Sequence, residues 1–324
     1  MDIDIGFVMD PLESINPKKD STIAMMRAAQ RRGWRVWYFG PEDMFVRDGE
    51  LRARRAAVTV SDETQRWYDV HEIVTRPVRE LDLLLMRKDP PFDMEYIYAT
   101  YLLEQAEREG VRVCNRPRAL RDCNEKYATT WFPHCAPPTL VGREAEVFRD
   151  FLREQGSIVV KPLDGMGGAS IFRIDQGDPN TNVILETLLR HGRSTAIAQR
   201  FLPEYAQGDK RILLIDGEPI PYALARIPAA GEARANLAVG GKGIGQPLSA
   251  RDLWICAEIA PELRRRGLTF VGIDVIGDYL TEINVTSPTG IRELDAQFGL
   301  DIGGALMDAL AAQLESPQPP HVKC

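Results

Sequence analysis

The chain has few of the residues from which metal centres and disulfide frameworks are built. Its 324 residues include only five cysteines, none in a paired C-x-x-C spacing, and four histidines that stand apart from one another. An odd number of unpaired cysteines favours reduced thiols in a cytoplasm over a disulfide framework. The isolated histidines argue against a zinc site.

Long apolar segments and basic blocks are also missing. No apolar run approaches membrane length, and the start MDIDIGFVMD lacks the basic region and apolar core of a signal peptide. The formal net charge is -7, and no segment is dominated by Lys and Arg, which argues against nucleic acid as the main partner. We therefore expect a soluble, cytoplasmic protein that binds neither membrane nor nucleic acid. At 324 residues the chain is long enough for two or three packed units, and its 44% of hydrophobic residues is typical of a globular protein.

The first third of the chain has the alternation of strands and helices typical of an α/β unit. Strands are predicted at 3–9, 35–39, 81–86 and 111–115, and helices at 21–33, capped by Asp20 or Ser21, and at 94–109. Such alternation favours a mostly parallel sheet covered by helices. Ligands bind beyond the carboxyl ends of such strands, which is where Arg87 falls.

From about residue 124 the pattern changes to helices and hairpins. Helices are predicted at 143–155, 183–189, 250–266 and 302–314, a strand at 195–203, and hairpins at 157–174, 210–224 and 270–285. The middle hairpin carries an Asp216-Gly217 turn. The glycine-rich stretch 228–245 is expected to be a lid. We predict an N-terminal domain at 1–122, two further units at 123–201 and 202–316, and a flexible tail at 317–324.

The stretch VVKPLDGMGGAS, at 159–170, predicts a glycine loop between two strands. It is not a Walker A loop, because Lys161 precedes the glycines instead of following them. It is not a Rossmann fingerprint either, because a strand-like segment follows where a helix should begin. A loop of this kind can fold over phosphates, as in protein kinases, or it can be an ordinary hairpin turn. The hairpin alone leaves both interpretations open.

The hairpin at 270–285 carries acidic residues inside otherwise apolar strands. A three-residue connection at 276–278 places Asp274, Leu280, Glu282 and Asn284 on one face. A two-residue turn at 277–278 would put Asp274 among the apolar side chains, so the longer connection is predicted. Two carboxylates and an amide oxygen form a ligand set suited to Mg²⁺ held together with phosphates. The alternative is a solvated polar face; with the glycine loop, the set predicts a site for a nucleoside triphosphate.

These segments resemble the ATP-grasp ligases and, more narrowly, the prokaryotic glutathione synthetase family. The likeness runs from residue 5 to about 314 and is carried by long strings such as LLMRKDPPFD, RPRALRDCNEK, KPLDGMGGASIFR, NLAVGGKG and LTEINVTSPTGIRE. It implies an ATP-grasp fold, of mixed α/β (α+β) class, preceded by an N-terminal Rossmann-like pre-ATP-grasp domain. The chain departs from the family at Gly290, where a thiol is often found, whereas Cys123 matches.

The resemblance also implies roles for individual residues. For ATP it implies Lys126, Lys161, Gly165, Gly167, Gly168, Gln199, Phe201, Leu202, Asp209, Arg211, Arg226 and Asn236. For the dipeptide it implies Arg87, Ser287, Thr289 and Arg292, and for the metal Asp274, Glu282 and Asn284. Arg226, Arg292 and Lys161 are the implied catalytic residues.

The implied activity is that of a glutathione synthase. ATP, with Mg²⁺ or Mn²⁺, would phosphorylate the carboxylate of γ-glutamylcysteine, and glycine would displace phosphate to give glutathione. The family also implies a homotetramer. A second ATP-grasp ligase would differ only around Arg87 and Arg292, and a nucleotide-binding regulator would not need Asp274 or Glu282. An NAD-dependent dehydrogenase is discounted because no glycine turn follows IGFVMD.

Overall fold

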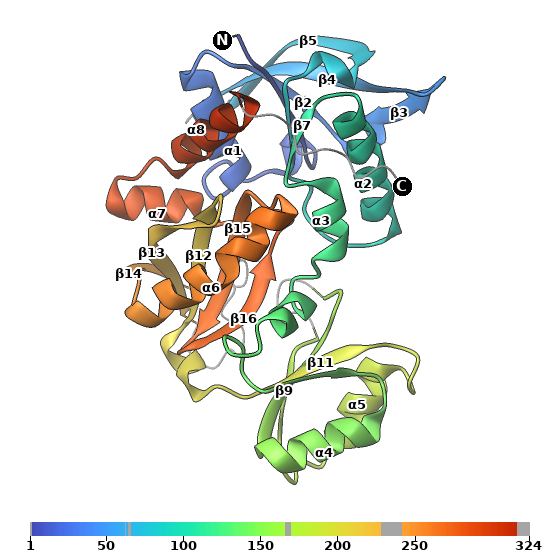
Figure 1. Ribbon diagram of the computed structural model, residues 1–324, viewed down its shortest axis with the longest axis vertical. Helices are drawn as coiled ribbons and strands as arrows, with labels where there is room; N and C mark the ends of the chain where they lie inside the picture. Colours follow the sequence, from blue (N-terminus) through green and yellow to red (C-terminus); the bar gives the residue numbers. More distant parts are fainter. Residues whose placement is uncertain (1, 62, 64–65, 166–169, 228–241, 316–324) are drawn as a thin grey trace.

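The computed structural model describes residues 2–61, 63, 66–165, 170–227 and 242–315. They form three sheets stacked along the long axis of the molecule (Figure 1). The N-terminal sheet lies at one end, a small sheet with two helices at the other, and the third sheet between them.

The N-terminal sheet has the strand order β3-β4-β2-β1-β6-β7, with β5 paired to β4. Its strands are β1 Asp4–Val8, β2 Arg35–Phe39, β3 Met44–Arg47, β4 Glu50–Val60, β5 Tyr68–Pro77, β6 Leu83–Met86 and β7 Arg112–Cys114. The predicted parallel pairing holds for β2-β1-β6-β7. The antiparallel group β3-β4-β5 was not predicted, although its Asp48-Gly49 turn, with φ of 52° and 84°, is a recognisable hairpin signal.

Three helices cover this sheet: α1 Ser21–Arg31, α2 Met94–Arg108 and α8 Ile302–Glu315. The expected cap is present, because the Asp20 carboxylate accepts from the N–H groups of Thr22 and Ile23 at 2.6 and 3.0 Å. On the predicted apolar face of α8, Ile302, Leu306 and Leu310 are buried. This helix packs on α1, and at Gly303 an added Cβ would lie 2.9 Å from a backbone oxygen of α1, so only glycine permits the approach.

The small sheet is antiparallel, in the order β10-β9-β11-β8. It consists of β8 Thr139–Gly142, β9 Ser157–Pro162, β10 Phe172–Asp175 and β11 Ala196–Arg200, with α4 Ala145–Gln155 and α5 Thr181–Leu189 beside it. The predicted strand, glycine loop, strand arrangement is confirmed by the pairing of β9 with β10. This unit has a hydrophobic core of its own, centred on Phe148.

The third sheet has the order β14-β13-β12-β15-β16. Its elements are β12 Asp209–Ile215, β13 Glu218–Ile227, β14 Lys242–Pro247, β15 Phe270–Ile276 and β16 Tyr279–Asn284, with α6 Ala250–Arg266 and α7 Ile291–Phe298. The predicted Asp216-Gly217 turn is confirmed, since both residues have positive φ, 49° and 76°. Residues 228–241 of the expected lid and the whole expected tail lie outside the described residues. The end of the expected lid, 242–245, is instead part of β14, which pairs with β13.

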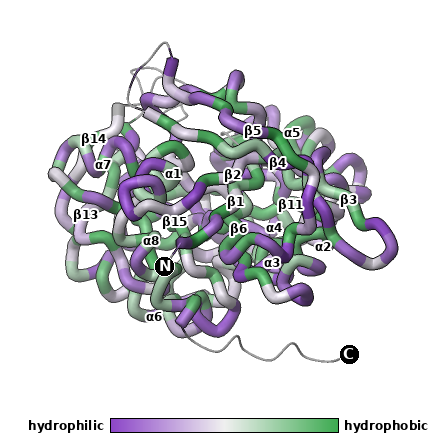
Figure 2. The backbone as a smooth tube through the Cα atoms, turned by 90° about the horizontal axis from the view of Figure 1, so that it is seen from above, coloured by the Kyte–Doolittle hydropathy of each residue, from purple (hydrophilic) through white to green (hydrophobic). Residues whose placement is uncertain are grey.

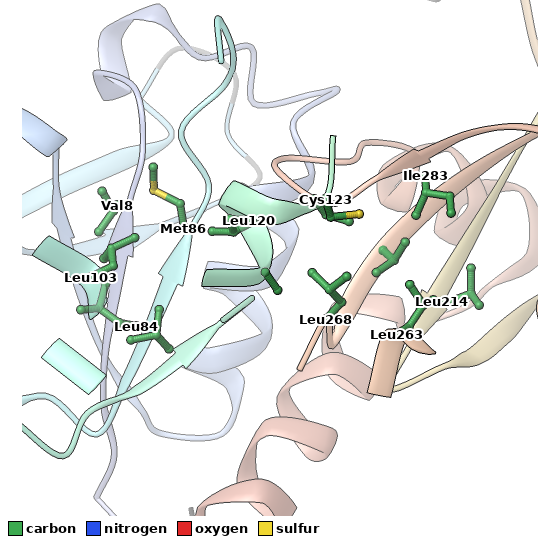
Figure 3. Close-up of a cluster of buried hydrophobic side chains, with 14 of the residues drawn as sticks. Val8, Leu84, Met86, Leu103, Leu120, Cys123, Leu214, Leu263, Leu268 and Ile283 are labelled. Atoms are coloured by element: carbon green, nitrogen blue, oxygen red, sulfur yellow. The ribbon is translucent and has the colours of Figure 1, made fainter. Parts of the chain in front are cut away.

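Short helices complete the connections: α3 Pro117–Asp122, and the 3-10 turns η1 Leu12–Ser14, η2 Pro41–Asp43, η3 Val78–Glu80, η4 Tyr127–Trp131 and η5 Pro203–Gln207. The N-terminal and third sheets share one hydrophobic core. It runs from Val8 and Leu84 through Leu120 of α3 to Leu268 and Ile283 (Figure 3). In the hydropathy view, hydrophobic segments gather on the central strands and hydrophilic segments on the periphery (Figure 2). The third sheet therefore packs against the first through this core.

Candidate active site

The acidic hairpin differs from the prediction in its turn. The connection has two residues, Gly277 and Asp278, because Ile276 pairs with Tyr279. A β-bulge at Thr281 then restores the register, so that Asp274 lies opposite Glu282 after all. The bulged Thr281 is buried, and its hydroxyl donates to the Asp274 carbonyl at 3.1 Å.

The bulge sorts the side chains of the hairpin onto two faces. Asp274 and Glu282 pair directly, and Asn284 donates from its amide nitrogen to the Asp274 carboxylate at 3.3 Å. Leu280 was predicted on this face, but it pairs with Val275 and is buried in the apolar core. The structure thus brings together the three expected metal ligands and removes Leu280 from among them.

Asp274 is the centre of a buried cluster of charges. Arg211 donates to both of its oxygens, at 2.5 and 3.0 Å, and Arg226 approaches one of them at 2.8 Å. All three side chains are buried. Burial alone would raise the pKa of Asp274, but Arg211 and Arg226 hold it well below its usual range. The two guanidinium groups therefore favour the charged form of Asp274.

Asp209, across β12 and β13 from Arg226, is the second carboxylate of the cluster. It forms an ion pair with the Arg226 guanidinium through one oxygen, while its Oδ1 atom is buried and has no partner among the described residues. Burial raises the pKa of Asp209 to about 6, against the lowering effect of Arg226. For Arg226, burial would lower the pKa, but Asp209 and Asp274 together raise it.

Two lysines reach the site from the glycine hairpin and from the segment before η4. The Lys161 ammonium lies 3.5 Å from the Glu282 carboxylate. Lys126, which could have been an exposed helix residue, is buried; its ammonium donates to the Gly165 carbonyl at 2.6 Å and forms an ion pair with Glu125. Burial would lower the pKa of Lys126, but Glu282 and Glu125 raise it, so the ammonium stays charged.

The expected adenine residues lie at the end of β11. Gln199 is buried, and its amide nitrogen has no hydrogen-bond partner among the described residues. The Phe201 N–H donates to the Ser157 carbonyl at 2.9 Å, and the Phe201 ring lies 3.9 Å from the Arg173 guanidinium carbon. Leu202 is buried. The unpaired Gln199 amide is a donor suited to a ligand.

Arg87 follows β6 at the carboxyl end of the parallel strands, as expected. It is buried, which excludes a surface ion pair with Asp89. Its guanidinium donates to the Thr22 hydroxyl and to the Pro288 carbonyl, each at 3.1 Å, and the remaining terminal nitrogen, Nη1, has no partner among the described residues. Burial lowers the pKa of Arg87, opposed by Asp20 and Asp89.

The other expected dipeptide residues follow the acidic hairpin. Ser287 hydrogen-bonds to the Asp89 carboxylate, and the Thr289 carbonyl accepts from Arg211 at 3.4 Å. The segment after β16 therefore spans from Arg87 to the charged cluster. Arg292 lies in the first turn of α7, partly buried. Gly167, Gly168 and Asn236 lie outside the described residues.

Two residues next to Lys126 were missed by sequence reasoning. The Asn124 amide donates to the Leu163 carbonyl of the glycine hairpin at 2.9 Å, and the Glu125 carbonyl accepts from Ile283 of β16 at 2.7 Å. Burial and the nearby Glu282 raise the pKa of Glu125, while Lys126 opposes them. The string NEK within the family-like segment RPRALRDCNEK was the available signal, but it does not say which side chains face the site.

The donor atoms of this cluster are all hard. Across the described ranges, no three His, Cys, Asp or Glu side chains gather so as to hold a metal ion by themselves. Two carboxylates and an amide could hold a metal ion only together with oxygens from a ligand such as a triphosphate.

Within the described ranges, no helix is both long and apolar enough to cross a membrane.

Comparisons with known proteins agree with this geometry. The prokaryotic glutathione synthetase N-terminal domain matches residues 3–121, and the prokaryotic glutathione synthetase ATP-grasp domain matches 125–299. A glutathione synthetase of Pseudomonas aeruginosa is 59% identical over 97% of this chain and 99% of its own. One from Vibrio vulnificus is 55% identical over 98% of this chain and 99% of its own.

Solved structures with lower identity show the same fold. A D-cycloserine synthetase superposes with a TM-score of 0.68 at 16% identity, over 96% of this chain and 99% of its own. An ATP-grasp ligase complexed with a precursor peptide superposes with a TM-score of 0.61 at 19% identity, over 97% and 98%. The fold and the charged site define an ATP-dependent ligase that forms a peptide bond and uses a divalent metal. The chain belongs to the prokaryotic glutathione synthetase family.

Proposed function

We propose that this protein joins γ-glutamylcysteine to glycine with Mg·ATP, giving glutathione, ADP and phosphate. The observation that carries the proposal is the meeting of Asp274, Arg211, Arg226 and the Glu282–Lys161 pair beside a glycine hairpin. Membership of the glutathione synthetase family supports the substrates. The protein makes glutathione in an ATP-dependent reaction, as its relatives are named for doing.

For the nucleotide, we propose that the base lies against Gln199, Phe201 and Leu202, and the ribose against Asp209. The buried amide nitrogen of Gln199 and the buried Oδ1 of Asp209, both unpaired among the described residues, support this fit. The phosphates would be held by four cations already gathered in the site and by the glycine loop. These residues are Lys126, Lys161, Arg211 and Arg226, with Asn236 and the loop glycines Gly165, Gly167 and Gly168.

For the metal, we propose Asp274, Glu282 and Asn284 as ligands to Mg²⁺, or to Mn²⁺ in its place. The hard oxygen donors support this choice, because they match the preference of both ions. When bound, the ion would neutralise phosphate charge and orient the γ-phosphoryl group. Arg211 and Arg226 favour the charged form of Asp274, which keeps this ligand available.

For the dipeptide, we propose Arg87, Ser287, Thr289 and Arg292. The buried Arg87 supports this assignment most directly, because its guanidinium has neutral hydrogen-bond partners and one nitrogen without any among the described residues. A guanidinium in that state is suited to a substrate carboxylate. Burial makes such a contact both stronger and more selective.

The chemistry would proceed in two transfers. An oxygen of the glycine-facing carboxylate of γ-glutamylcysteine attacks the γ-phosphorus, the bond to the ADP oxygen breaks, and an acyl phosphate forms. The neutral amine of glycine then attacks the acyl carbon, phosphate leaves, and the amine proton is released. Lys161, Arg226 and Arg292 would stabilise the negative charge that develops in these steps. Positioning and charge stabilisation would supply most of the catalysis.

Three further statements remain proposals. They are a cytoplasmic location, based on the cysteine usage, a homotetramer, based on family resemblance, and the domain limits 1–122, 123–201 and 202–316, based on the sequence pattern. The homotetramer is checked by sedimentation equilibrium of the purified protein.

The experiment that tests the proposed function is ADP release with Mg·ATP, γ-glutamylcysteine and glycine, with each amino substrate omitted in turn. Release that needs both, with an amide product, is the expected result. Release with another amine in place of glycine would point to a different ATP-grasp ligase. ATP binding without any turnover would contradict the proposal and favour a nucleotide-binding regulator.

A further inference from the structure

The segment Asn124 to Lys126 touches both sides of the candidate site. Asn124 and Lys126 donate from their side chains to the carbonyls of Leu163 and Gly165, at 2.9 and 2.6 Å. Between them, the Glu125 carbonyl accepts from the N–H of Ile283 in β16. The segment therefore ties the glycine hairpin of the small sheet to the acidic hairpin of the third sheet.

The Glu125 side chain forms an ion pair with the Lys126 ammonium. The Lys126 side chain is 3% exposed and that of Glu125 is 24% exposed, so the pair is largely shielded from water. A lysine side chain has many rotamers, and a fixed carboxylate beside the ammonium restricts them. The Gly165 carbonyl is the other contact of this ammonium.

Charge alone gives little reason for a carboxylate at this position, because the charge of Glu282 raises the pKa of Lys126 more than the charge of Glu125 does. The site already contains the carboxylates of Asp209, Asp274 and Glu282, and a fourth would repel a triphosphate. The negative charge of Glu282 also raises the pKa of Glu125, so a second acid here is unfavourable by charge. A positional role accounts for Glu125 where an electrostatic role does not.

We propose that Glu125 is a positioning residue that holds the Lys126 ammonium in place at the phosphate end of the site. The backbone of Glu125 is anchored on β16, so its carboxylate has a fixed position relative to Asp274 and Glu282. Lys126 would then meet the phosphates already oriented. This inference rests on the proposed role of Lys126 at the nucleotide phosphates.

The test is a double-mutant cycle with Glu125→Gln, Lys126→Met and the double variant, supplemented by Glu125→Asp. Two quantities are measured: kcat with its KM for ATP, and the Kd of a non-hydrolysable ATP analogue with Mg²⁺ by calorimetry. We expect Glu125→Gln to lower kcat about tenfold and to change the analogue Kd by less than about threefold. Glu125→Asp, which keeps the charge, should recover much of kcat. In the Lys126→Met background, Glu125→Gln should change kcat by less than about twofold.

Three outcomes would overturn the inference. If the kcat of the double variant falls by the product of the two single-variant effects, Glu125 acts independently of Lys126. A tighter analogue Kd with unchanged kcat would reduce Glu125 to a source of repulsion. Wild-type behaviour of Lys126→Met would refute the proposed role of Lys126 itself, and with it that of Glu125.

Two controls keep the result interpretable. Glu258→Gln removes a carboxylate that is paired with His134 on the surface of α6, and it should leave both quantities unchanged. Thermal unfolding of every variant separates loss of fold from loss of position. If Glu125→Gln does not fold, the cycle is run with Glu125→Ala, where the same lack of additivity is expected.

Discussion

Two groups of buried arginines differ in what balances their charge. Arg211 and Arg226 share the carboxylates of Asp274 and Asp209 at ion-pair distance. Arg87 donates to a hydroxyl and a carbonyl, and no carboxylate lies within ion-pair distance of it among the described residues. The protein's own carboxylates therefore balance the arginines on the proposed phosphate side of the site. On the proposed dipeptide side, we expect a substrate carboxylate to pair with Arg87.

Asp274→Asn is expected to have the largest effect, because Asp274 forms ion pairs with both Arg211 and Arg226. The amide keeps the shape but loses the charge that faces Arg211 and Arg226, and removes one proposed metal ligand. We expect kcat to fall at least about 1000-fold and unfolding free energy to fall by about 3 kcal/mol. Steady-state kinetics and urea unfolding measure the two quantities.

The matched control for this variant is Asp252→Asn. Asp252 is equally buried and pairs with Lys210 at 2.5 Å, but it belongs to the cap of α6 and not to the site. It should lose stability and keep kcat. Retained activity in Asp274→Asn would contradict the proposed metal site.

Arg87→Met tests the buried arginine that has no carboxylate within ion-pair distance among the described residues. Because two hydrogen bonds but no ion pair are broken, unfolding free energy should fall by about 1 to 2 kcal/mol, less than in Asp274→Asn. The KM for γ-glutamylcysteine should rise about 100-fold, through loss of a charge-assisted hydrogen bond, while the KM for ATP stays the same.

Arg55→Met serves as the comparison for Arg87→Met. Arg55 is also buried, but it pairs with Glu80 at 2.8 Å in the N-terminal sheet. It should leave the dipeptide KM unchanged. A large loss of stability in Arg87→Met, with normal KM, would show that Arg87 is structural.

The fold was predictable from sequence wherever local chemistry decides it. Asp20 caps α1, Asp216 and Gly217 make the turn between β12 and β13, and the spacing of Ile302 and its partners marks α8. What local chemistry cannot show is that α8 packs on α1, at the opposite end of the chain. That contact depends on the close approach at Gly303, which only the folded molecule reveals.

The site was predictable in its residue types and less so in its geometry. The turn at Gly277 and Asp278 was assigned one residue too many, because the bulge at Thr281 corrects the register without any signal in the sequence. The argument from buried charge still placed Asp274 with Glu282 correctly. Glu125 was missed because its role depends on the backbone contact with β16.

Gln199→Leu extends the comparison to a neutral side chain. The Gln199 amide nitrogen is buried and unpaired within the described part of the chain, so its replacement should not reduce stability. If this amide binds the adenine, the Kd of an ATP analogue should rise about tenfold. Gln30→Leu is the matched control, since its amide accepts from and donates to Val60 at 2.7 and 3.2 Å. Gln30→Leu should lose stability and keep nucleotide affinity; the reverse pattern would contradict the assignment.

The smallest expected effect is the pH dependence of stability that comes from Asp209. Its pKa is raised, whereas the pKa of Asp274 is lowered. Burial raises the pKa of Asp209 to about 6, above its ordinary value of 3.8, so the folded protein binds this proton more tightly than the unfolded chain does. The charged carboxylate thus lowers the free energy of unfolding above pH 6, and this cost fades as pH falls from 6 towards 4.

Relative to Asp209→Asn, the free energy of unfolding of the wild type, measured with urea, should rise by about 1 kcal/mol between pH 7 and pH 5. Asp175→Asn should show no such gain, because Ser157 and Arg173 lower the pKa of Asp175. A constant difference between wild type and Asp209→Asn would mean that Arg226 compensates Asp209 as fully as it does Asp274.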